Sequence, residues 1–83
     1  MDSGHLMKLV IEEASRLQNS QLTDEFMARP VFKNENKEEL VQVIDQLIED
    51  KALDTFIYSE DYAGTNYSIS GITVHGKKFY YSL

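Results

Sequence analysis

The spacing of apolar residues changes once along this chain, close to Leu53, and this change constrains the fold more than any other feature. Before it, Leu40, Ile44 and Leu47 recur at the three- and four-residue intervals of an amphipathic helix. After it, residues 55–58 and 67–72 are rich in the aromatic and β-branched side chains typical of strands. We therefore expect an α+β chain in which helices come first and a β-hairpin follows.

Two helices are expected before Pro30. Apolar residues at helical spacing predict the first at Gly4–Gln18. The second is short, Asp24–Ala28, and Thr23 is expected to cap it because its hydroxyl can accept from the amides of the first turn. Pro30 favours extended geometry at the residue before it and so ends this helix.

The third helix carries the clearest amphipathic pattern and is expected at Lys37–Lys51. Asn36, followed three residues later by Glu39, is typical of a capped helix start. In the connection before this helix, either Val31 or Phe32 is expected to fill the core.

The hairpin is predicted from two strands, Thr55–Tyr58 and Tyr67–Ile72, joined by Ser59–Asn66. That loop is expected to be too long for a two-residue turn, with Gly64 supplying a positive backbone angle. Residues 74–83 fit either a strand or a helix.

We favour a terminal helix beginning after Thr73, which is a good cap. Gly76 within that segment should weaken the helix by about 1 kcal/mol relative to alanine.

This order of elements predicts a winged helix-turn-helix: three helices, a two-stranded hairpin wing and a short C-terminal helix. The segment Ile72-Thr73-Val74-His75-Gly76-Lys77-Lys78-Phe79 resembles the Ile-Thr-x-x-Gly-x-x-Phe/Tyr-Leu ending of small winged-helix proteins of Gram-positive bacteria and their phages, including the YjcQ-like family. The resemblance covers residues 36–83, and Lys51 and Ala52 stand where that group usually has a glycine. It implies a wing strand leading into a last helix, and no catalytic residue.

Composition is consistent with a single domain spanning residues 1–83. Hydrophobic residues make up 42% of the 83, there is no cysteine, and the formal net charge is −6. We expect a cytoplasmic protein without a membrane segment, because no apolar run approaches the roughly 18 residues that span a bilayer. Met7 could serve as a start as well as Met1, and the sequence leaves open whether residues 1–6 are native.

The surfaces that a winged helix would turn toward DNA are acidic in this chain. Acidic surfaces repel phosphates and so oppose binding to DNA, whereas they favour binding to a basic protein surface. The alternatives for the third helix are a solvated polar face, a protein contact, and base readout by its glutamines. The candidate interaction surface comprises Glu38, Gln42, Asp45, Gln46 and Glu49 on the third helix, and Glu60, Asp61 and Tyr62 on the wing.

No pattern of catalytic or ligand-binding residues is evident. His5 and His75 have no partner at metal-ligand spacing, and neighbouring acidic residues on a helix point about 100° apart, so they do not converge on a substrate. We expect no enzymatic activity, no metal and no cofactor.

The expected function is a protein-protein interaction or inhibitor module, of phage or prophage origin. The alternative is a transcriptional regulator that binds DNA as a dimer. Surplus aromatic residues in the C-terminal half make a homodimer a further open alternative, since they could bury themselves against a second subunit.

Overall fold

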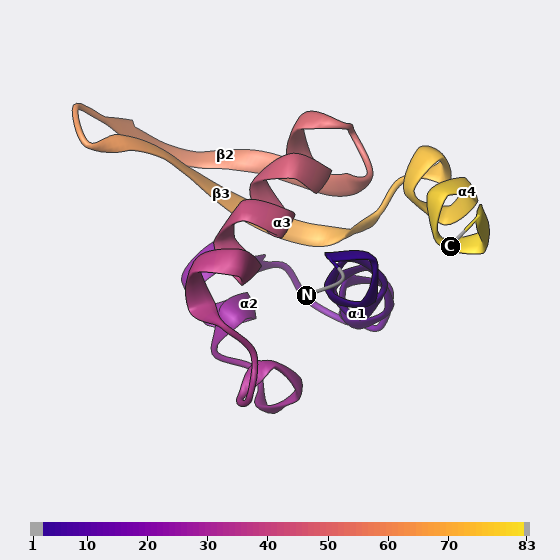
Figure 1. The fold of residues 1–83 in the computed structure, drawn as a ribbon. Helices are drawn as coiled ribbons and strands as arrows, with labels where there is room; N and C mark the ends of the chain where they lie inside the picture. The colour runs from indigo at the N-terminus through magenta and orange to yellow at the C-terminus, as the bar shows by residue number, and fades with distance from the viewer. Residues whose placement is uncertain (1–2, 83) are drawn as a thin grey trace.

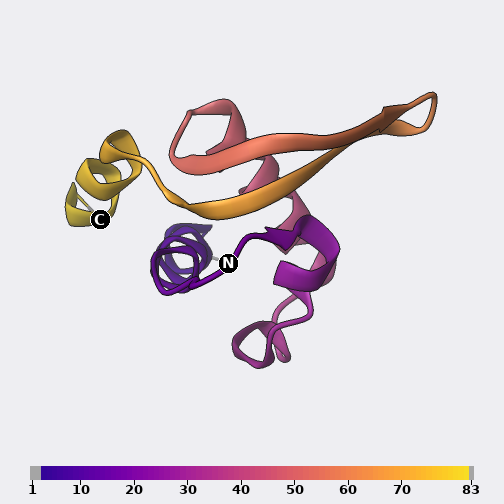
Figure 2. The same ribbon diagram turned by 180° about the vertical axis from the view of Figure 1, so that it is seen from behind.

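The chain folds as α+β, with α-helices before and after a β-hairpin that belongs to a three-stranded antiparallel sheet (Figure 1). The computed structural model describes residues 3–82. The hairpin of β2 (Leu53–Asp61) and β3 (Gly64–Ile72) extends beyond the helices at its tip, and α4 (Val74–Ser82) lies at the opposite end, as the view from behind also shows (Figure 2). The elements are α1 Ser3–Ser15, β1 Gln21–Leu22, α2 Thr23–Met27, a 3-10 turn η1 Pro30–Phe32, α3 Lys37–Glu49, β2 Leu53–Asp61, β3 Gly64–Ile72 and α4 Val74–Ser82.

The expected start of α3 is confirmed. The Asn36 side chain accepts a hydrogen bond from the Glu39 N–H at 3.0 Å, which satisfies one of the free amides of the first turn. The helix ends at Glu49 rather than Lys51, and α1 ends at Ser15 rather than Gln18.

Thr23 does not cap α2, and that prediction was wrong. Leu22 occupies the cap position, and its N–H donates to Glu25 Oε1 at 3.1 Å. The Thr23 hydroxyl instead donates to the Tyr67 carbonyl at 3.1 Å, because α2 starts directly from a strand that lies beside β3. The hydroxyl therefore links α2 to the sheet.

The sheet has the order β1-β3-β2, so β3 is its central strand. β1 was missed from the sequence because two residues carry no periodicity. It pairs Gln21 with Ile69 and Leu22 with Ser68, which places the entry to α2 against the hairpin.

The hairpin is longer and its turn tighter than predicted. The strands continue to Asp61 and Gly64, leaving only Tyr62 and Ala63 in the turn. Asp61 Oδ1 accepts from the Ala63 N–H at 2.9 Å, an Asx-type contact that stabilises so short a turn. Gly64 has a φ of +139°, so its predicted positive angle is confirmed.

A core of buried apolar side chains lies between the helices and the sheet. Of the two residues expected to fill the core after α2, Phe32 is buried and Val31 is exposed. The ring centroids of Phe32 and Phe26 lie 5.3 Å apart. The buried apolar residues are Leu6, Val10, Ile11, Ala14, Phe26, Phe32, Leu40, Val43, Ile44, Leu47, Ala52, Leu53 and Ile69.

The end of α3 forms a Schellman motif. The Ala52 N–H donates to the Leu47 carbonyl at 2.9 Å and the Lys51 N–H to the Ile48 carbonyl at 3.1 Å. Lys51 has a φ of 62°, the left-handed conformation that glycine usually supplies at this position.

The predicted helix after Thr73 is present, and Thr73 caps it by accepting from the Gly76 N–H at 2.9 Å. The same hydroxyl donates to the Lys51 carbonyl at 2.6 Å, and the Thr73 N–H donates to the Ala52 carbonyl at 3.1 Å. A Cβ on Gly76 would lie 2.0 Å from the Ala52 carbonyl oxygen. Thr73 and Gly76 therefore fasten α4 onto the turn that ends α3, and we call this contact the α3–α4 junction.

Lys51→Gly should raise the free energy of unfolding by about 1 kcal/mol, because glycine adopts the left-handed conformation without the steric cost of a Cβ. Urea denaturation followed by circular dichroism measures this change. Lys51→Ala is the matched control, since it removes the charge and keeps the Cβ. Equal stability of the two variants would contradict the left-handed geometry.

Gly76→Ala tests the close approach of α4 to Ala52. Helix propensity alone predicts a gain of about 1 kcal/mol, whereas overpacking against backbone predicts a loss of about 1–3 kcal/mol. We expect the loss. Lys77→Ala, at an exposed position of the same helix, should change stability little, and a stabilising Gly76→Ala would contradict the packing.

Candidate functional site

The outward face of α3 carries all five predicted residues of that helix, and each is exposed: Glu38, Gln42, Asp45, Gln46 and Glu49. Gln46 Nε2 donates to Asp50 Oδ1 at 3.1 Å, so this amide is already engaged on the helix. Val41 is 37% exposed, which adds an apolar side chain to the face.

The tip of the β2–β3 hairpin, which we call the wing tip, carries the other three predicted residues, Glu60, Asp61 and Tyr62, all exposed. Tyr62 lies in the two-residue turn and is fully exposed, so its ring does not fold back over the hairpin. Asp61 also accepts the turn hydrogen bond from Ala63, which gives this carboxylate a structural role.

The structure does not bring these two groups together. The wing tip extends clear of the helices, while α3 lies across the base of the hairpin (Figure 1). The predicted surface is thus divided into a helix part and a tip part, with the stem of the hairpin between them.

A groove of about 760 Å³ lies between α3 and the stem of the hairpin. It includes two predicted residues, Asp45 and Glu49, and brings them near residues that were not predicted. We call it the α3–wing groove. Its lining is Asp45, Ile48, Glu49, Lys51, Leu53, Asp54, Thr55, Ile57, Tyr67 and Thr73.

The register of the sheet explains why Leu53, Thr55, Ile57 and Tyr67 line this groove, and Asp54 near the start of β2 also lines it, outside this alternation. Thr55 is paired with Ile69 and Ile57 with Tyr67, and directly paired residues point to the same face. Leu53, Thr55 and Ile57 alternate along β2, and this alternation is the sequence signal that could have identified them. Their position beside α3 requires the tertiary structure.

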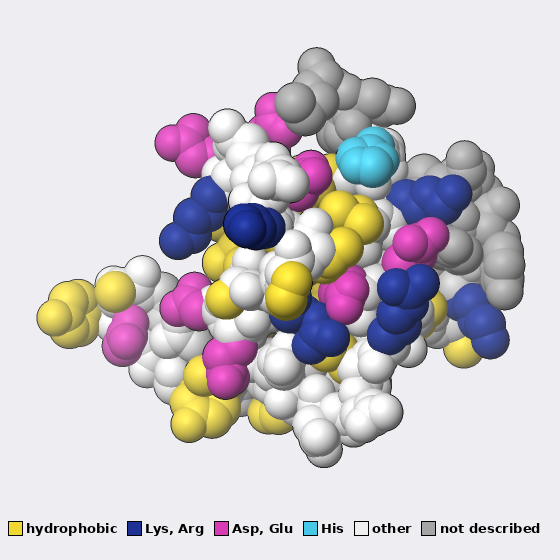
Figure 3. Space-filling view, turned by 90° about the horizontal axis from the view of Figure 1, so that it is seen from below, with side chains coloured by type: hydrophobic (Ala, Val, Ile, Leu, Met, Phe, Trp, Pro, Cys, Tyr) yellow, Lys and Arg dark blue, Asp and Glu magenta, His cyan; other side chains and the backbone are white. Residues whose placement is uncertain are grey.

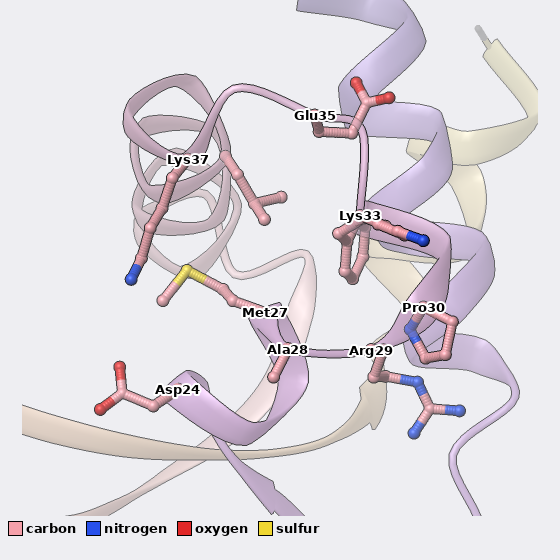
Figure 4. A pocket seen from close by; sticks show the side chains of 10 residues that line it. Asp24, Met27, Ala28, Arg29, Pro30, Lys33, Glu35 and Lys37 are labelled. Carbon is pink, nitrogen blue, oxygen red and sulfur yellow. The ribbon is translucent and has the colours of Figure 1, made fainter.

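A second hollow, of about 880 Å³, lies between α2, η1 and the start of α3 (Figure 4). Met27 and Leu40 contribute apolar surface, and Asp24 and Lys37 project near each other on one side. Arg29 is directed away from them and is held by Glu13 and Gln21, at 3.0 Å each. The mixed charges give this hollow no preference for an anion or a cation.

Charges of both signs are interspersed on the face seen from below, where dark blue and magenta side chains alternate (Figure 3). Within residues 3–82, no three His, Cys, Asp or Glu side chains are arranged to hold a metal ion. No helix in the described part of the chain has the length and apolar character needed to cross a membrane.

Searches against protein-family models, curated proteins and solved structures find no match to this chain.

Proposed function

We propose that this chain is a small winged-helix protein that acts by binding another protein, without catalysis. The element order supports a winged helix: three helices precede a long hairpin, β1 pairs beside it, and a last helix follows. The resemblance of residues 72–79 to small winged-helix proteins of Gram-positive bacteria and phages is consistent with this proposal. We also propose that the protein acts in the cytoplasm.

The charge of α3 is the observation that carries the proposal. In a winged helix the third helix is the one that would enter the major groove of DNA. Here Glu38, Asp45 and Glu49 project from its outward face, and each would meet phosphates with the wrong sign. The same carboxylates would attract a basic protein surface and speed its association.

The wing tip strengthens the same interpretation. Glu60 and Asp61 occupy positions where a DNA-binding wing would offer lysine or arginine. Tyr62, the first residue of the turn, presents its whole ring to solvent, and tyrosine provides a large contact area at a low cost in conformational entropy. A partner that normally binds nucleic acid fits this surface, so inhibition by DNA mimicry is one form of the proposed function.

The DNA-binding alternative predicts a different result with duplex DNA. We expect no complex between the wild-type protein and a random-sequence duplex at low salt, where electrostatic binding is strongest. The triple variant Asp45→Lys/Glu49→Lys/Glu60→Lys should gain salt-sensitive binding, because it makes the same surface basic. Fluorescence anisotropy of a labelled duplex measures both.

A salt-sensitive complex of the wild-type protein would favour the transcriptional regulator instead. Affinity capture then tests the protein partner: bait carrying Asp45→Lys/Glu60→Lys/Tyr62→Ala should lose proteins that the wild-type bait retains. Recovery of the same proteins with the same affinity would exclude this surface.

A further inference from the structure

The floor of the α3–wing groove is apolar and partly open to solvent. Ile57 is 54% exposed although it lies on the same face of β2 as the buried Leu53, and both line the groove. Ile48 and Tyr67 are half-buried beside it. An exposed isoleucine next to other apolar side chains offers a place to bury one apolar side chain of a partner.

The rim of this groove is acidic. Asp45 and Glu49 lie on the α3 side and Asp54 on the β2 side, and Lys51 at the end of α3 is the one basic residue of the lining. Carboxylates on both sides of an apolar floor match a segment in which an apolar side chain is flanked by lysine or arginine.

We infer that the α3–wing groove binds a basic segment of a partner protein, with one large apolar side chain of that segment seated against Ile48, Ile57 and Tyr67. This inference rests on the proposed function and specifies where and how the partner is held. The rim carboxylates orient the segment, and the apolar floor supplies most of the affinity, since exposed charge pairs contribute little to binding.

The opposite face of β2 provides a control of nearly equal exposure. Phe56 is 50% exposed and directly precedes Ile57, but alternation along the strand turns it away from α3, and it does not line the groove. An exposed apolar side chain is thus present on both faces of the hairpin, whereas an acidic rim around an apolar floor is a property of the groove.

The experiment uses three short peptides as probes. The first has a central pair of leucines flanked by lysines, the second replaces the leucines with serines, and the third replaces the lysines with glutamates. Binding to the full chain is followed by amide chemical shifts. We expect saturable binding of the first peptide alone, with the largest shifts at Ile48, Leu53, Ile57 and Tyr67.

Single substitutions then assign the binding to the groove. Ile57→Ser should weaken binding of the leucine peptide about tenfold or more, which is the effect of removing a central contact. Phe56→Ser should leave the affinity within about twofold. Glu49→Lys should weaken binding several-fold and reduce its salt dependence. Unchanged amide spectra away from each substitution show that the variants remain folded.

Three results would overturn the inference. Equal binding of the leucine and serine peptides would show attraction by charge alone, and absence of binding by the leucine peptide would exclude this class of ligand. Loss of affinity in Tyr62→Ala but not in Ile57→Ser would place the contact at the wing tip, which would keep the proposed interaction function and remove the groove from it.

Discussion

The Thr73 hydroxyl makes the contact on which the arrangement of the C-terminal half depends. It donates to the Lys51 carbonyl at the end of α3 and accepts from Gly76 at the start of α4, so one oxygen joins two helices that are separated in sequence by the whole hairpin. The Thr73 N–H binds the Ala52 carbonyl, which fixes the exit of β3 beside the entry to β2. Because Thr73 and Lys51 also line the α3–wing groove, the α3–α4 junction defines one end of the candidate binding site.

Several elements could be predicted because their signals are local. The cap at Asn36, the helix after Thr73 and the positive angle at Gly64 all depend on residues within a few positions of one another. The cost assigned to Gly76 was incomplete, since glycine is also the residue that allows α4 to approach Ala52. Helix propensity is a local property of the residue, whereas this close approach involves Ala52, a backbone segment more than 20 residues away in sequence.

The incorrect predictions concern side chains whose hydrogen-bond partners the sequence pattern does not reveal. Thr23 has the chemistry of a cap, but β3 lies close enough for its hydroxyl to reach the Tyr67 carbonyl. The loop between the two strands was predicted too long, because the sequence does not show that Asp61 Oδ1 accepts from the Ala63 N–H and so closes a two-residue turn. The α3–wing groove combines residues from a helix and two strands. The acidic residues of α3 were identifiable from sequence, and alternation could have placed Ile57 on one face of β2, but the position of that face beside α3 depends on the tertiary structure.

The α3–α4 junction holds α3, the hairpin and α4 as one unit. Amide hydrogen exchange in Thr73→Val tests it directly, because valine keeps the shape of threonine and removes the hydroxyl. We expect faster exchange both in the first turns of α4 and at Lys51 and Ala52, with a loss of about 1–2 kcal/mol in the free energy of unfolding. Faster exchange confined to α4, with Lys51 and Ala52 unchanged, would contradict it.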